Sequence, residues 1–269
     1  MFFRLLAAVV VFSVSSVAVS HAGPLDEDGV VTRFVGQGEI NWTRLVVRTS
    51  GSGKPESDIS NPKIRRLSAE RSAKIDALRE ALEVIRDIRV DAETRVEDYY
   101  VASGYVRSRI DVAMRSAAVV DRRYLSGGEV EVVVEVPMTG VLMEVAVPQE
   151  SVPKVSSRGE DEYTGLIVDA RGLDINPALA PRILDGEMRE LYGPPFVRRD
   201  LLVRGGIALY VDDMDVAAAR GRVGDRPLVV RGVRASGAGN TDIVISGSSA
   251  SLFRGSAFLE EGRVIIVID

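Results

Sequence analysis

The sequence predicts an α+β protein in which a long N-terminal helix packs on a small antiparallel sheet and a second, mixed α/β domain follows. Three observations lead to this prediction: a long amphipathic helical pattern at residues 62–87, a valine-rich hairpin at 112–136, and a strand–helix pattern that starts again at Tyr163. A chain of 269 residues has room for two domains. Its 46% hydrophobic and 27% charged residues are typical of globular proteins.

The first 22 residues have the organisation of a secretory signal peptide. Arg4 precedes the apolar stretch Leu5–Phe12, and small residues flank His21. This order predicts cleavage after Ala22 and a periplasmic mature protein. A retained membrane anchor is the alternative, but serines interrupt the apolar run, which is marginal against the roughly 20 apolar residues that a spanning helix needs.

The residue types that are missing limit the chemistry. The chain has no cysteine, and its one histidine, His21, lies in the predicted signal. Zinc sites of the Cys/His kind, histidine triads, thiol nucleophiles and disulfides are therefore not expected in the mature protein. The formal net charge of −5 argues against nucleic acid as the main partner, since no basic excess exists to displace phosphate counterions.

The first domain is predicted over residues 23–147. Gly36-Gln37-Gly38 introduces a strand-like stretch at 40–48, and Gly51–Pro55 has the composition of a loop. Asn61-Pro62 is a strong helix start, with Asn as the N-cap and Pro at the first helical position. In the helix that follows, one face carries Ile64, Leu67, Ile75, Leu78, Leu82 and Ile85, and a flanking stripe carries Ala69, Ala73, Ala77 and Ala81.

A short strand at 88–96 and a weaker helix at 103–111 are expected next. A hairpin then joins residues 112–125 to 129–136 across Ser126-Gly127-Gly128. Valine and glutamate alternate along its second arm, which predicts one buried and one solvated face. Pro137 confines that arm to the edge or the end of a ladder.

Residues 148–162 are the predicted linker, and residues 163–269 form the second domain. Its strands are expected at 163–170, 207–211, 227–233, 242–246 and 263–268. A hairpin tip is expected at 182–188, because Asp185-Gly186 favours a tight turn. Short helices are expected at 214–220 and 248–258.

Asp169 and Arg171 are the most functional-looking local pair. Two residues apart at the end of a strand, a carboxylate and a guanidinium project to the same side and could bind a charged ligand, or could form a structural ion pair. Two other motifs fail in detail. Gly51–Pro55 lacks the first Gly and the Ser or Thr of a phosphate loop, and the aspartates at 212–215 lack the calcium-loop spacing and are favoured at a helix start.

Residues 30–138 resemble a family of bacterial envelope proteins, the LPP20-type lipoproteins and the N-terminal domain of the flagellar assembly protein T. The features that carry the resemblance are Gly36-x-Gly38, the Ala-rich helix Ser68–Leu78, the strand Ile88–Asp91 and the hairpin Gly128–Val136. The resemblance implies a non-catalytic role at the periplasmic face of the outer membrane, in some members within rings around the flagellar basal body. It brings no catalytic residues, and the lipoprotein cysteine is missing here.

The leading hypothesis is thus a periplasmic structural or assembly protein without enzymatic activity, cofactor or metal. Envelope or flagellar basal-body proteins are the expected partners, and a second copy of the chain is a further candidate. Interface anchors are expected among sheet edges and the aromatic residues Trp42, Tyr99, Tyr100 and Tyr105. Two alternatives stay open: a carboxylate-dependent hydrolase of an envelope polymer that uses Asp169, and a small-ligand or ion-binding module.

Overall fold

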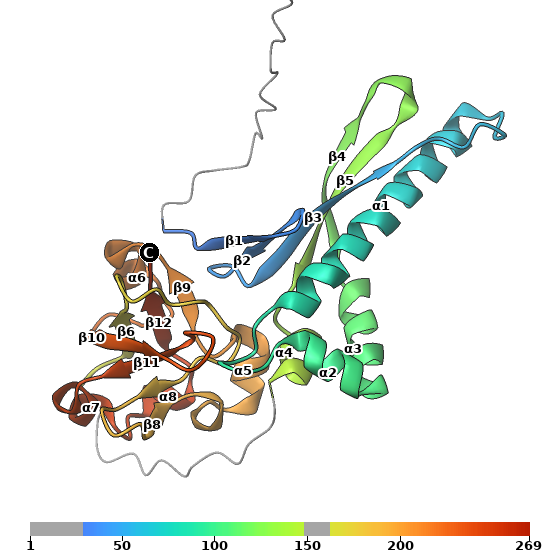
Figure 1. The fold of residues 1–269 in the computed structure, drawn as a ribbon. Coiled ribbons are helices and arrows are strands. Elements are labelled where there is room, and N and C mark those ends of the chain that lie inside the picture. The colour runs from blue at the N-terminus through green and yellow to red at the C-terminus, as the bar shows by residue number, and fades with distance from the viewer. Residues whose placement is uncertain (1–28, 148–161) are drawn as a thin grey trace, which may run out of the picture.

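The structure, a computed structural model, describes residues 29–147 and 162–269 (Figure 1). The predicted signal peptide and nearly all of the predicted linker lie outside these residues. The described chain forms two sheets, one of five strands and one of seven, each with helices of its own. The predicted α+β class, with a long helix on an antiparallel sheet and a second mixed domain, is confirmed.

The first sheet has the order β1-β2-β3-β5-β4, and all its neighbouring strands are antiparallel. Its strands are β1 (Thr32–Val35), β2 (Gly38–Asn41), β3 (Val46–Gly53), β4 (Ala118–Tyr124) and β5 (Val130–Pro137). The hairpin of β4 and β5 is confirmed. The single strand expected at 40–48 is wrong, since a turn at 42–45 separates β2 from β3, and Gly51 and Gly53 belong to β3 rather than to a loop.

Helix α1 (Pro62–Asp87) begins and ends where the sequence predicts. The Asn61 side chain accepts hydrogen bonds from the backbone N–H groups of Lys63 and Ile64, at 3.0 and 3.4 Å. The buried face of the N-terminal two-thirds of the helix is the alanine stripe. On the flanking face Ile64, Leu67 and Ile75 are exposed, while Leu78 is half-buried against the alanine stripe. The reason lies in β3, whose glycines let the helix backbone approach the strand directly.

Three further helices complete the first domain: α2 (Val96–Ala102), α3 (Gly104–Arg115) and α4 (Val141–Ala146). The strand expected at 88–96 is wrong. Only an isolated bridge, between Arg89 and Arg95, forms there, and the backbone at Arg89 and Val90 instead accepts hydrogen bonds from Leu179 and Ala180 of the second domain. The weaker predicted helix corresponds to α3, which runs on to Arg115 and shortens the first hairpin arm.

The second sheet has the order β8-β7-β11-β10-β6-β12-β9. Its strands are β6 (Gly165–Asp169), β7 (Ile183–Leu184), β8 (Glu190–Tyr192), β9 (Leu209–Val211), β10 (Pro227–Ser236), β11 (Asp242–Ile245) and β12 (Val264–Val267). Strands β10, β6, β12 and β9 are parallel, and β11 runs antiparallel to β10. Its helices are α5 (Arg199–Gly205), α6 (Met214–Ala219), α7 (Gly247–Phe253) and α8 (Ala257–Glu260), so the helix expected at 248–258 is in fact two.

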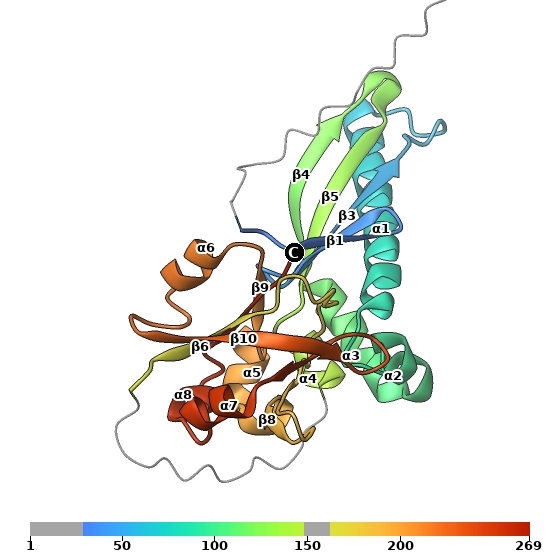
Figure 2. The same cartoon turned by 60° about the vertical axis from the view of Figure 1, so that its left-hand side comes forward.

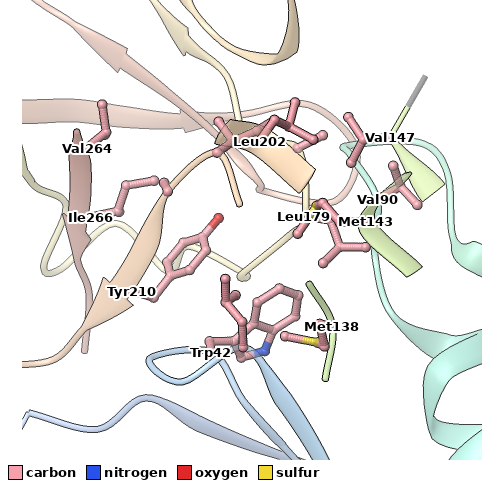
Figure 3. Close-up of a cluster of buried hydrophobic side chains, with 14 of the residues drawn as sticks. Trp42, Val90, Met138, Met143, Val147, Leu179, Leu202, Tyr210, Val264 and Ile266 are labelled. Carbon is pink, nitrogen blue, oxygen red and sulfur yellow. The ribbon is translucent and has the colours of Figure 1, made fainter. Parts of the chain in front are cut away.

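The two domains share one hydrophobic core. Its largest cluster of buried side chains runs from Val31 and Ile85 of the first domain to Tyr192 and Ile266 of the second. Figure 3 shows the middle of this cluster, where Trp42 lies beside Tyr210. The strands thus form two separate sheets, but the side chains of both domains pack into one hydrophobic core.

The N-terminal part of α1 and the hairpin of β4 and β5 project away from this shared core. Both views show them rising together as an arm beyond the second domain (Figures 1 and 2). Helices α2 and α3 lie beside the other end of α1, at the base of the arm. The arm therefore extends beyond the core, while its base is fixed by packing against α2 and α3.

Candidate interaction surfaces

Asp169 and Arg171 form the ion pair that the sequence suggests. Asp169 is the last residue of β6, and its two carboxylate oxygens accept hydrogen bonds from Nε and a terminal nitrogen of Arg171, at 2.8 and 3.0 Å. These bonds hold the pKa of the Asp169 carboxyl below its ordinary value and raise the pKa of Arg171. Asp169 is therefore ionised at neutral pH and poorly suited to act as a general acid.

This pair lies at the edge of the sheet where the parallel strands end. Asp213 and Asp269 are close enough to Arg171 to favour its charged form, and Asp269 accepts a 2.6 Å hydrogen bond from the backbone N–H of Gly172. Beside the pair, Arg171, Arg231 and the serines at 246 and 249 line a shallow hollow of about 490 Å³. Asp169, Asp213 and Asp269 offset part of the positive charge of Arg171 and Arg231 beside this hollow.

Two other carboxylates of the second domain are buried, and both are fully engaged. Asp185, with a side chain 3% exposed, is paired with Arg189 and Arg254 at 2.8 and 3.1 Å. Asp242 is paired with Arg182 at 2.6 Å. Burial acts to raise the pKa of Asp185, but hydrogen bonds from the backbone and guanidinium of Arg189 outweigh it and lower that pKa. These ion pairs hold loops in place, and the lowered pKa of Asp185 keeps that carboxyl ionised at neutral pH.

Trp42 is not an exposed anchor, and its assignment as an interface residue is wrong. It is 3% exposed and meets Tyr210 edge-on, with ring centroids 5.7 Å apart. Next to it, Thr43 accepts a 2.8 Å hydrogen bond from Val31 N–H and donates a 2.7 Å bond to the Tyr210 carbonyl. Trp42 is thus a core residue that joins the two domains.

Tyr99 and Tyr100 lie on α2 and are half-buried against the shared core. Arg86 and Arg107 lie over the ring of Tyr100, at 5.3 and 6.0 Å from its centroid. Both rings are therefore partly used in packing α2 onto the end of α1.

Tyr105 is the one predicted aromatic anchor that is freely exposed, at 66%. It lies on α3 at the rim of a hollow of about 890 Å³ that both domains line, here called the junction hollow. Its lining residues are Tyr105, Val106, Glu144, Val145, Val147, Arg199, Asp200, Val203 and Arg204. The structure does not bring Tyr105 together with Asp169, which ends β6 in the interior of the other sheet and lies outside the junction hollow.

Hydrogen bonds between the α4 and α5 regions fix the walls of the junction hollow. Arg199 donates hydrogen bonds to the carbonyls of Glu144 and Val147, and Gly140 N–H donates a 2.7 Å bond to the Val203 carbonyl. Sequence reasoning missed these residues because it missed both helices. Neither has a side-chain N-cap bond that would mark its start.

The described residues hold no group of three or more His, Cys, Asp or Glu side chains arranged to bind a metal ion. Within residues 29–147 and 162–269, no helix has the length and apolarity needed to cross a bilayer.

With this geometry established, a family resemblance can be placed on the fold. Residues 165–269, from the first residue of β6 to the end of the sequence, match the family described as Treponema pallidum Tp0624, second domain. No curated protein matches the chain. The match covers the second domain and leaves the resemblance of residues 30–138 as a prediction.

Proposed function

We propose that this chain is an exported, non-catalytic assembly protein of the bacterial cell envelope that works by binding other envelope proteins. The observation that carries the proposal is the junction hollow, which the two domains build together and which presents Tyr105 beside valines and mixed charges. An exposed aromatic ring at the rim of an apolar depression with a polar surround is typical of a protein-binding hot spot.

The shared core supports a role that depends on shape. Among the described residues, hydrogen bonds cross between the domains at five places, which include Leu179 to Arg89 and Gly140 to Val203. A surface fixed in this way loses little conformational entropy when a partner binds, so its contacts contribute more fully to affinity.

The carboxylates argue against the hydrolase alternative. A glycosidase needs two carboxyl groups that face one substrate, with one pKa raised so that it donates a proton. Asp169, Asp185 and Asp242 are instead each held by arginine, and the pKa values of Asp169 and Asp185 are lowered.

The resemblance of residues 30–138 to LPP20-type and flagellar assembly T proteins supports a site of action at the outer membrane or the flagellar basal body. Envelope proteins of that region, or a second copy of this chain, are the partners that the proposal names. The predicted export signal and periplasmic location belong to the same proposal.

The test is site-specific photo-cross-linking in intact cells from position 105. We expect defined adducts with envelope proteins or with the chain itself, and we expect Val145→Asp, within the junction hollow, to remove them. Leu252→Asp, at an apolar residue of α7 that is 54% exposed, is the matched control and leaves them unchanged.

Two results would contradict the proposal. The first is a set of adducts that Val145→Asp does not alter. The second is turnover of peptidoglycan or another envelope glycan by the purified protein that Asp169→Ala abolishes without changing its melting temperature.

A further inference from the structure

The N-terminal half of α1 carries a row of exposed aliphatic side chains along the outside of the arm. Ile64, Leu67 and Ile75 are 54%, 55% and 50% exposed, and none of them joins a cluster of packed hydrophobic residues. Together with Arg71, which lies between them on the same face, they form what is here called the α1 ridge. At 1.5 Å per residue the ridge is about 17 Å long.

The ridge exists because other residues pack the helix onto the sheet. Ala69, Ala73 and Ala77 are fully buried against β3 and β5, so the isoleucines and the leucine are not needed for the fold. A row of three aliphatic side chains costs solubility when it faces water, and such exposed apolar rows mark sites of interaction.

The charge around the α1 ridge has one sign. From Pro62 to Ile75 the helix carries five cations and one carboxylate, although the whole chain has a formal charge of −5. The carboxylate, Glu70, is held on the strand side of the helix by Arg66 and by Tyr124. The side chains of Lys63, Arg65, Arg71 and Lys74 make no hydrogen bond or ion pair with the described residues.

The positions of these cations relate them to the aliphatic row. With 3.6 residues per turn, Lys63 and Lys74 lie on one flank of the ridge and Arg65 on the other. Lysine and arginine on the flanks can extend along a helix and place their charges level with the tips of the apolar side chains. The ridge is thus complementary to a surface that has an apolar interior and carries anionic groups where it meets water.

A lipid surface fits this arrangement better than an acidic protein. Protein hot spots are dominated by Trp, Tyr and Arg that fill pockets, whereas the ridge offers only Ile and Leu as its apolar anchors. The N-terminal part of α1, which carries the ridge, projects on the arm away from the second domain (Figures 1 and 2), so a flat surface can approach this part of the helix. Aliphatic residues flanked by Lys and Arg are the pattern of helices that lie in a membrane interface.

We propose that the α1 ridge adsorbs onto an anionic lipid surface, with its aliphatic side chains among the headgroups and its flanking cations on the lipid phosphates. The second domain then faces away from the lipid. The inference does not rest on the junction hollow, and a purified protein and vesicles suffice to test it.

The experiment is co-sedimentation of the full chain with vesicles of equal parts phosphatidylglycerol and phosphatidylcholine, at low and at high salt, with pure phosphatidylcholine vesicles as the neutral reference. One variant removes charge (Lys63→Gln, Arg71→Gln and Lys74→Gln), and one removes apolar surface (Leu67→Ser and Ile75→Ser). A control variant, Val229→Ser with Arg231→Gln, makes the same kinds of change on exposed residues of β10. All proteins keep the same N-terminal residues, so any binding through those is common to all.

We expect the wild type to partition onto the anionic vesicles in preference to the neutral ones, and less so at high salt. The charge variant should lose about 100-fold in partition coefficient, at about five-fold for each cation. The apolar variant should also bind more weakly, and the β10 control should bind like the wild type. All variants should keep the wild-type melting temperature, because every altered residue is exposed.

The proposal is overturned if the wild type does not prefer anionic vesicles, or if either ridge variant binds as the wild type does. It is equally overturned if the β10 control loses as much as the ridge variants. If the ridge binds an acidic helical peptide but does not bind the vesicles, its partner is an acidic protein and not a lipid surface, and the proposal is overturned.

Discussion

Replacement of Gly51 by alanine tests how closely α1 lies on β3. A Cβ atom added at Gly51 would come within 2.1 Å of the Ala77 backbone nitrogen and 2.5 Å of the Ala73 carbonyl oxygen. Both atoms belong to the helix backbone, so no side chain can rotate away, and the helix must move by about an ångström. Gly53 is in the same position against the carbonyl oxygen of Ala69, at 2.1 Å.

The cost of Gly51→Ala follows from the packing that this movement breaks. Overpacking a tight core costs about 1–3 kcal/mol in free energy of unfolding. Because the added Cβ atom on β3 would meet backbone atoms of α1, which cannot rotate aside, we expect Gly51→Ala to cost about 3 kcal/mol or more. For a protein of this size that is a fall of about 6–12 °C in melting temperature.

The assay is thermal unfolding followed by circular dichroism, with Gly104→Ala as the matched control. Gly104 is the first residue of α3 and has open space where a Cβ would be, so alanine there should leave the melting temperature equal or slightly higher. If Gly51→Ala is as stable as Gly104→Ala, the close packing of α1 on β3 is wrong.

Three further predictions concern the second domain. Arg222 donates hydrogen bonds to the carbonyls of Gly205, Gly206 and Ile207, at and after the end of α5, and to that of Val264 in β12. Arg222→Met should therefore lower the free energy of unfolding by about 3 kcal/mol, measured by urea denaturation, and an unchanged midpoint would contradict this. Tyr192→Phe, which removes a 2.6 Å bond to the Ile207 carbonyl, should cost about 1 kcal/mol in the same assay, and a stabilised variant would show that bond to be unimportant. Because the pKa of Asp185 is lowered in the folded state, its ionised carboxylate stabilises the fold at pH values above the ordinary carboxyl pKa. This stabilisation is lost as the pH falls through the pKa of Asp185 in the folded state. Asp185→Asn should therefore melt below the wild type at neutral pH, with a gap that narrows below about pH 4, and a gap independent of pH would contradict this.

The parts of the fold that local signals encode could be predicted from the sequence. Asn61-Pro62 defines the start of α1 through the N-cap bonds of Asn61, and the Val/Glu alternation of 129–136 defines β5. Apolar runs predict five strands of the second domain, β6, β9, β10, β11 and β12, whereas β7 and β8 are predicted only as a hairpin around Asp185-Gly186. In each case the residues that form the sequence pattern also make the contacts that stabilise the helix or strand.

The face that α1 buries could not be predicted from the helix alone. Ile64, Leu67 and Ile75 are more apolar than the alanine stripe, so periodicity favours them as the packing face. Gly51 and Gly53 on β3 decide which face of α1 packs on the sheet, because the helix backbone lies so close to them that only small side chains such as alanine fit between. A strand with Gly at alternate positions before a helix with Ala at every fourth is the signal that could have revealed it.

The candidate site was only partly predictable for the same reason. The Asp169–Arg171 pair is local and was found. The burial of Trp42 depends on Tyr210, far away in the sequence, and the junction hollow depends on α4 and α5, which carry no clear start signals. Tyr105 was identified as an aromatic residue, but its place at the junction follows only from the docking of the two domains.

The most direct test of the shared core is amide hydrogen exchange of Trp42→Ala. Removing this indole should cost about 3–5 kcal/mol through the cavity it leaves. Because Trp42 packs on Tyr210, we predict faster exchange in β9 and β12 of the second domain as well as in β3 and β5 of the first. Faster exchange confined to β3 and β5, with β9 and β12 as protected as in the wild type, would show two independent cores.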